Sequence, residues 1–229
     1  MLARDWYYNE RNRIGLDHAV ASIYGAGDDA DERARAALKM LGVKPGWRVA
    51  DIGCGNGVLA TEAALLGAVV DAIDIFFNDT ATTEIYTRDR RTAVRMHSAG
   101  LLSFAYEANS YDLIASEFTL HHLPDFWKAV ALARIYGALK PGAQFFLRDI
   151  VYVSMPDGAE RSIEQWADFN IKNHDLARDS VITHMRDENS TFAWVMERML
   201  SEVGFVTVSA DYHAPMHATY VLQKPAGQG

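Results

Sequence analysis

An aspartate followed by three glycines at alternate positions is the stretch of this sequence best suited to bind a ligand. Asp51 closes a short apolar run, and Gly53, Gly55 and Gly57 follow it. Glycine lets the backbone turn sharply and come close to a ligand, because no Cβ lies in the way. The residues after Gly57 favour a helix, whose first N–H groups and positive dipole end would face the turn. The pattern predicts a nucleotide-binding turn.

Two carboxylates stand in register with this turn. Asp74 lies 17 residues beyond Gly57, close to where nucleotide-binding folds place an acid that accepts hydrogen bonds from ribose hydroxyls. Asp51 is able to accept hydrogen bonds from an ammonium group and to offset its charge. A lone aspartate at a strand end more often caps a helix or a turn. The register of both acids with the glycines favours ligand binding here.

Alternating strands and helices are expected to position these residues. A strand over residues 49–52, a helix over 58–66 and a strand over 68–73 make a βαβ unit. The other expected helices are 30–41, 125–138, 159–177 and 191–202, the last capped by Ser190, and the other expected strands are 92–97, 111–116, 144–153, 205–212 and 217–223. The polar segment 174–189 is expected to be a solvated connection, with a substrate lid as the alternative. This order of elements indicates the α/β class.

The composition restricts the class of partner. The 229 residues are 49% hydrophobic and can bury a full core. A net charge of −8 without a long run of Lys or Arg argues against nucleic acid or an anionic membrane surface as partner. The single cysteine, Cys54, suits a reducing cytosol. Charged residues interrupt any signal peptide, and no apolar stretch reaches the ~20 residues of a membrane span. We expect a cytoplasmic protein that acts on a small molecule, with its oligomeric state open.

The stretch Asp51–Gly57 (DIGCGNG) resembles the cofactor loop of class I S-adenosylmethionine-dependent methyltransferases. In a dinucleotide-binding loop the third glycine comes three positions after the second, whereas Gly57 comes two positions after Gly55. Three further segments resemble the family: 111–116 (YDLIAS), 121–125 (HHLPD) and 139–142 (LKPG). The resemblance covers most of the chain. It implies a Rossmann-like, doubly wound sheet of seven strands, mostly parallel, with a C-terminal antiparallel hairpin.

The resemblance also implies S-adenosylmethionine as cofactor and a small-molecule methyl acceptor. It assigns the ribose to Asp74, the rim of the methionine or substrate pocket to Glu117, and the adenine to Gly100 and Leu101, where the acid usual in the family is missing. The cofactor-binding residues that it implies are Asp51, Gly53, Cys54, Gly55, Asn56, Gly57, Asp74, Ile75, Gly100, Leu101 and Glu117. Methyl transfer from a sulfonium needs mainly alignment, which supplies ~7–11 kcal/mol without a catalytic side chain.

A hydroxyl acceptor would still benefit from a general base. The candidates are Tyr8, His18, His121 and Asp149. The adjacent His121 and His122 do not predict a metal site, because neighbouring side chains point in different directions and no cysteine cluster supports zinc. We expect one of these histidines to be packed and the other to lie at the surface. Asp149 is expected either to face the substrate or to form a structural pair with Arg148.

Two segments stand apart from this scheme. Residues 1–29 are rich in aromatic side chains and are expected to form an N-terminal arm, either a lid over the pocket or a segment packed on the domain. Residues 30–229 are expected to form a single methyltransferase domain. Residues 76–87 (FFNDTATTEIYT) resemble the conceptual translation of a sequencing-library adapter. We interpret them as an assembly artefact, which replaces the small turn and amphipathic helix that the family would have there.

Two other functions stay open. A nicotinamide-dependent oxidoreductase would share the strand, the turn, the helix and the ribose acid, but the glycine spacing counts against it. A non-catalytic protein that binds S-adenosylmethionine is also compatible with the sequence, above all if residues 76–87 are genuine.

Overall fold

The computed structural model describes residues 30–74, 93–174, 178–213 and 216–227. Some expectations concern residues outside these ranges: the arm over 1–29 with Tyr8 and His18, the adapter-like segment 76–87, and Ile75. Among the helices within these ranges, none has the length and apolar character needed to cross a membrane.

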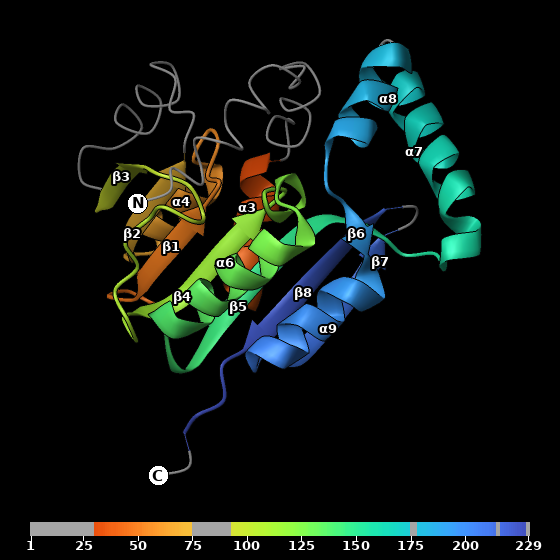
Figure 1. Ribbon diagram of the computed structural model, residues 1–229. Helices are drawn as coiled ribbons and strands as arrows, with labels where there is room; N and C mark the ends of the chain where they lie inside the picture. The colour runs from red at the N-terminus through yellow and green to blue at the C-terminus, as the bar shows by residue number, and fades with distance from the viewer. Residues whose placement is uncertain (1–29, 75–92, 175–177, 214–215, 228–229) are drawn as a thin grey trace.

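The sheet contains a long parallel part and an antiparallel edge. Its strands are β1 (Arg48–Ile52), β2 (Val69–Asp74), β3 (Val94–Ser98), β4 (Tyr111–Glu117), β5 (Leu139–Tyr152), β6 (Thr191–Phe192), β7 (Val206–His213) and β8 (His217–Gln223). They follow the order β3-β2-β1-β4-β5-β8-β7, with β6 paired to β5 (Figure 1). All pairs are parallel except β5 with β8 and β7 with β8. This confirms the predicted sheet and its C-terminal hairpin, to which the two-residue β6 is added.

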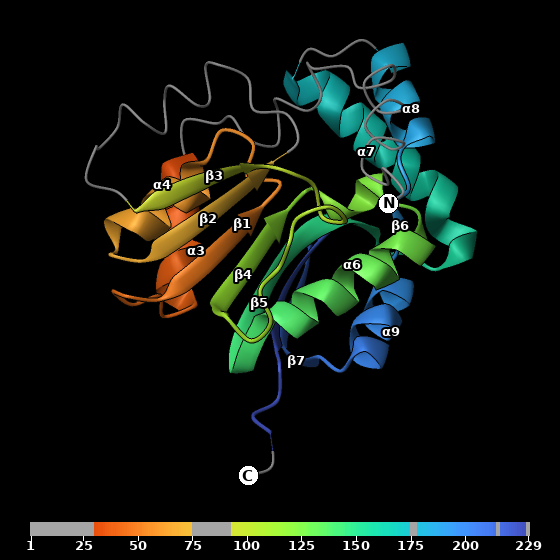
Figure 2. The ribbon, with the colours of Figure 1, turned by 60° about the vertical axis from the view of Figure 1, so that its left-hand side comes forward.

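Helices cover both faces of the sheet. They are α3 (Ala30–Met40), α4 (Val58–Leu65), α6 (Asp125–Ala138), α7 (Ala159–His174), α8 (Arg178–Asp187) and α9 (Ala193–Val203), with the 3-10 helices η1 (Leu120–His122) and η2 (Pro156–Gly158). Side chains alternate between the faces of a strand, so Val49 packs with α3 and α4, and Ala50 packs with α6 and α9. Figures 1 and 2 show these two helix pairs on opposite sides of the sheet.

The structure corrects several predicted boundaries. The segment predicted as a solvated connection contains α8, which packs beside α7 away from the two main layers (Figure 2). Ser190 does not cap a helix: α9 begins at Ala193 with Phe192 at its N-cap and no side-chain hydrogen bond there. The strand β5 begins at Leu139 instead of Gln144, because the predicted turn pairs with the start of β4 through a register irregularity.

The central strand β1 marks the place where a ligand is expected. The chain runs outward from β1 through β2 to β3, then returns to β4 on the other side of β1. In open α/β sheets, ligands bind outside the carboxyl ends of the strands at such a reversal of strand order. The residues that follow β1 and β4 are therefore the ones to inspect for a site.

Candidate functional site

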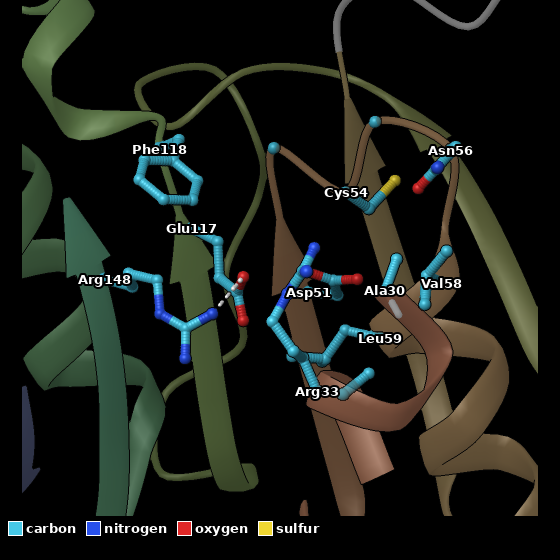
Figure 3. Close-up of a pocket in the computed structure, with 13 residues that line it drawn as sticks. Ala30, Arg33, Asp51, Cys54, Asn56, Val58, Leu59, Glu117, Phe118 and Arg148 are labelled. Atoms are coloured by element: carbon cyan, nitrogen blue, oxygen red, sulfur yellow. Dashed lines mark hydrogen bonds and ion pairs between the residues drawn. The ribbon is translucent and has the colours of Figure 1, made fainter. Parts of the chain in front are cut away.

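A pocket of about 170 Å³ lies at the carboxyl ends of β1 and β4. Its walls come from the glycine turn, the first turn of α3, the start of α4 and the ends of β4 and β5 (Figure 3). The lining residues are Ala30, Arg33, Ala34, Asp51, Gly53, Cys54, Gly55, Asn56, Val58, Leu59, Glu117, Phe118 and Arg148. Pockets for whole ligands are usually ~300–1,000 Å³, so the pocket formed by the described residues is smaller than a site for a whole nucleotide.

Asp51 lies at the base of this pocket and is only 3% exposed. Its Oδ2 accepts a hydrogen bond from the Ala60 N–H in the first turn of α4, at 3.0 Å. Burial, together with the nearby charges of Glu117 and Asp74, raises the pKa of Asp51 to about 8 against the single opposing hydrogen bond. The residue therefore caps α4 and also presents a carboxylate to the pocket. A bound cation would favour the ionised form of this carboxylate.

The glycine turn fits closely against the loop that follows β4. Gly53 has φ +71°, and a Cβ on it would lie 2.0 Å from Thr119 Oγ1. The Thr119 hydroxyl donates to the carbonyl of Glu117 at 2.8 Å, which holds this loop in place. Gly55 has φ +51° and open space where a Cβ would be, and Gly57 is the left-handed N-cap of α4. The turn thus needs glycine for its conformation and leaves room beside Gly55.

The other predicted cofactor residues that the structure describes lie outside the pocket lining. Asp74 Oδ2 accepts a hydrogen bond from the Gly55 N–H at 2.9 Å, so it contacts the turn directly. The Gly100 N–H donates to Ser103 Oγ at 3.1 Å, and Leu101 is 5% exposed within the core. Their roles toward ribose and adenine stay predictions.

Phe118, Arg148 and Arg33 line the pocket, although sequence reasoning did not predict them there. Phe118, directly after β4, has φ +50°, which is strained for a residue with a side chain. Arg148 lies opposite Glu117 in the register of β4 and β5, and its Nη1 lies 3.4 Å from Glu117 Oε2. Burial raises the pKa of Glu117, while Arg148 and Arg33 oppose the shift. Arg33 belongs to a helix distant in sequence from the glycine turn, and no local motif indicates it.

Two candidate general bases are held against each other outside the pocket. Asp149 is fully buried and does not line this pocket. Its Oδ1 lies 2.5 Å from His121 Nδ1, so the structural pair that it forms is with His121 instead of Arg148. A role of Asp149 toward the substrate stays a prediction. The Nε2 of His121 lies 3.2 Å from Glu188 Oε1. Burial lowers the pKa of His121, but the charges of Glu188 and Asp149 outweigh it and raise the pKa to about 10. A charged imidazolium cannot accept a proton, so this arrangement gives no support to His121 as a base.

Cys54 shows no sign of a nucleophilic role. It is 8% exposed in the turn. Burial and the charges of Asp51 and Asp74 raise the pKa of its thiol. The thiol therefore stays protonated, and its part in the site is to line the pocket.

Residues 26–210 match the family described as "Methyltransferase domain". The chain belongs to this family. Among its relatives, this methyltransferase chain is 33% identical over 129 residues to the 27-O-demethylrifamycin SV methyltransferase of Amycolatopsis mediterranei, covering 55% of this chain and 47% of that protein. It is 30% identical over 168 residues to phosphoethanolamine N-methyltransferase 2 of Caenorhabditis elegans, covering 70% and 38%. The chain thus spans less than half the length of these relatives.

A solved structure shows the same fold. The 1,6-didemethyltoxoflavin-N1-methyltransferase of Burkholderia thailandensis, with bound 1,6-didemethyltoxoflavin and S-adenosylhomocysteine, superposes with a TM-score of 0.67 and 17% identity, over 98% of this chain and 91% of that one. Family and fold together confirm the resemblance to class I methyltransferases and S-adenosylmethionine as the cofactor.

Proposed function

We propose that this chain transfers the methyl group of S-adenosylmethionine to an oxygen or nitrogen atom of a small organic acceptor. The observation that carries the proposal is one pocket that joins a buried carboxylate, an open glycine turn and a second carboxylate at the strand-order reversal. The relatives support the acceptor class, since their names refer to a rifamycin, phosphoethanolamine and a toxoflavin.

The pocket suits the methionine end of the cofactor. Asp51 and Glu117 both line it, and burial raises the pKa of each carboxylate. An ammonium group between them would stabilise both ionised forms. Arg33 also lines the pocket. Its guanidinium is positively charged and suits the carboxylate of the methionine part of the cofactor. We assign the ribose to Asp74 and the adenine to Gly100 and Leu101, as the family resemblance implies.

The bound cofactor supplies a methyl group activated by a positively charged sulfur. The chain's part is to align the acceptor and exclude water, which lowers such a barrier by ~7–11 kcal/mol. Phe118 and Arg148 form the rim between this pocket and the end of β5, and we place the acceptor there. Of the candidate bases, Tyr8 and His18 remain proposals. The pair of His121 and Asp149 is not assigned a proton-transfer role.

Three assignments about the whole chain belong to the same proposal. We infer that residues 30–229 form one methyltransferase domain, and that residues 1–29 form an arm over the pocket. The support for the arm is that Ala30, the first residue of α3, lines the pocket, so the arm joins the domain at its rim. We further propose a cytoplasmic location and no nucleic-acid partner, from the single cysteine and the net charge of −8.

Calorimetric titration with S-adenosylmethionine, S-adenosylhomocysteine and NAD tests this proposal. We expect both methionine-bearing nucleotides to bind. Glu117→Gln should bind them more weakly, and the matched change of an exposed glutamate on α7, Glu160→Gln, should not. A screen of hydroxyl and amine acceptors with methyl-labelled cofactor then identifies the acceptor class. Binding of NAD alone would overturn the proposal, and binding of S-adenosylhomocysteine without turnover on any acceptor would support a non-catalytic binding protein.

A further inference from the structure

Two histidines and a glutamate converge where η1 meets the segment after α8. The rings of His121 and His122 lie 4.1 Å apart between centroids. Glu188 Oε1 is 3.2 Å from His121 Nε2 and 3.5 Å from His122 Nδ1. The tight turn of η1 gathers two adjacent side chains that sequence reasoning expected to diverge. One nitrogen from each ring and one carboxylate oxygen all lie within 4.8 Å of one another.

We propose that His121, His122 and Glu188 bind a divalent transition-metal ion, with Zn²⁺ as the best match. In a tetrahedral site with bonds of ~2.0–2.1 Å, ligand atoms are roughly 3.3 Å apart. The two distances to the Glu188 oxygen are close to this length. Two imidazoles and one carboxylate form a ligand set typical of zinc, whereas Mg²⁺ and Ca²⁺ prefer oxygen ligands alone.

A second carboxylate orients the first ligand. Asp149 Oδ1 lies 2.5 Å from His121 Nδ1, on the side of the ring opposite to Glu188. Asp149 is itself fixed, since its oxygens accept hydrogen bonds from the N–H groups of His121 and Ile150 at 3.1 and 2.8 Å. Metal-binding histidines usually donate their other ring N–H to such a carboxylate, which fixes the tautomer and the ring orientation. This partner leaves Nε2 of His121 directed at the site.

Backbone contacts hold the third ligand in place. The Asn189 N–H donates to the His121 carbonyl at 2.8 Å, and its side-chain amide donates to the His122 carbonyl at 3.1 Å. Lys128 also donates to the Asn189 carbonyl. Asn189 therefore holds the adjacent Glu188 against η1, and this contact does not depend on a bound ion. A metal here would tie the end of α8 to η1, and the partly exposed His122, at 27%, is the side from which the ion enters.

The site is tested on the full chain, stripped with a chelator and titrated with ZnCl₂ by calorimetry. CoCl₂ serves as a spectroscopic probe, because its visible absorption reports tetrahedral coordination by nitrogen and oxygen. We expect about one ion per chain and a Zn²⁺-dependent rise in the unfolding temperature. Glu188→Gln and His122→Ala should each lower the affinity for Zn²⁺ by ~10–100-fold or more, because even the loss of a residue that only supports a ligand usually has an effect of this size.

The matched control is His213→Ala, which removes an exposed histidine of β7, a strand that β8 separates from β5 in the sheet. It should leave the affinity and the cobalt spectrum unchanged. An equal loss of affinity in the control would show that the ion binds through surface histidines and would overturn the proposal. Failure of the parent chain to bind Zn²⁺ would also overturn it and would leave a proton on His121 as the occupant. Because methyl transfer is not the readout, the result is independent of the proposed function.

Discussion

Replacing Gly53 by alanine tests the fit between the glycine turn and the loop after β4. The φ of +71° at this position would cost alanine about 1–2 kcal/mol. The new Cβ would also lie 2.0 Å from Thr119 Oγ1 and 2.8 Å from Thr119 Cβ, and overpacking of this kind costs about 1–3 kcal/mol. We therefore expect Gly53→Ala to lower the free energy of unfolding by about 2–5 kcal/mol.

Gly55→Ala separates the two contributions. Gly55 has a φ of +51°, but nothing lies within 4 Å of a Cβ built on it, so only the backbone cost of about 1–2 kcal/mol applies. Urea denaturation of both variants measures the difference. In a double-mutant cycle, Thr119→Ala should recover part of the loss in Gly53→Ala and none in Gly55→Ala. Equal destabilisation by the two glycine changes, without coupling to Thr119, would refute the reasoning.

Three further predictions follow. The pKa of Asp51 in the folded chain is about 8, above its value in the unfolded chain, so the contribution of Asp51 to stability is full in acid and is lost as pH rises to about 8. Asp51→Asn should therefore flatten the dependence of the unfolding free energy on pH between about 4 and 8. An unaltered slope would contradict this. Asp74→Ala should weaken binding of S-adenosylhomocysteine by about 1.5–3 kcal/mol, and an unchanged Kd in a folded variant would refute the ribose assignment. We expect the resequenced locus to lack the codons for residues 76–87. Intact genomic reads that retain these codons would refute the interpretation as an artefact.

The parts of the fold predicted correctly from the sequence depend on local patterns. The run from Asp51 to Gly57 specifies strand, turn and helix through neighbouring residues, and Asp125–Ala138 is helical over the predicted range. The error at α8 has a different cause. Its sequence is polar, the side chains described in it are exposed, and the helix packs beside α7, which no local pattern reveals.

The site residues that sequence reasoning missed depend on contacts between distant segments. Arg33 reaches the pocket only because α3 packs beside α4. Glu188 meets His121 across 67 positions of sequence. In both cases the residue type is unremarkable in its own segment, and only the tertiary fold gives it a partner.

The end of β5 shows how one pairing decides such an assignment. Adjacent side chains of a strand point to opposite faces, so Arg148 and Asp149 cannot both face the pocket. The sequence shows this alternation but does not show which of the two residues faces the pocket. The register decides this, because Glu117 pairs with Arg148, and paired residues share a face of the sheet. Once Glu117 lines the pocket, Arg148 must do so as well, and Asp149 is directed to the other face, where it meets His121. A single register therefore separates Arg148, which lines the pocket, from Asp149, which contacts a ligand of the proposed metal site.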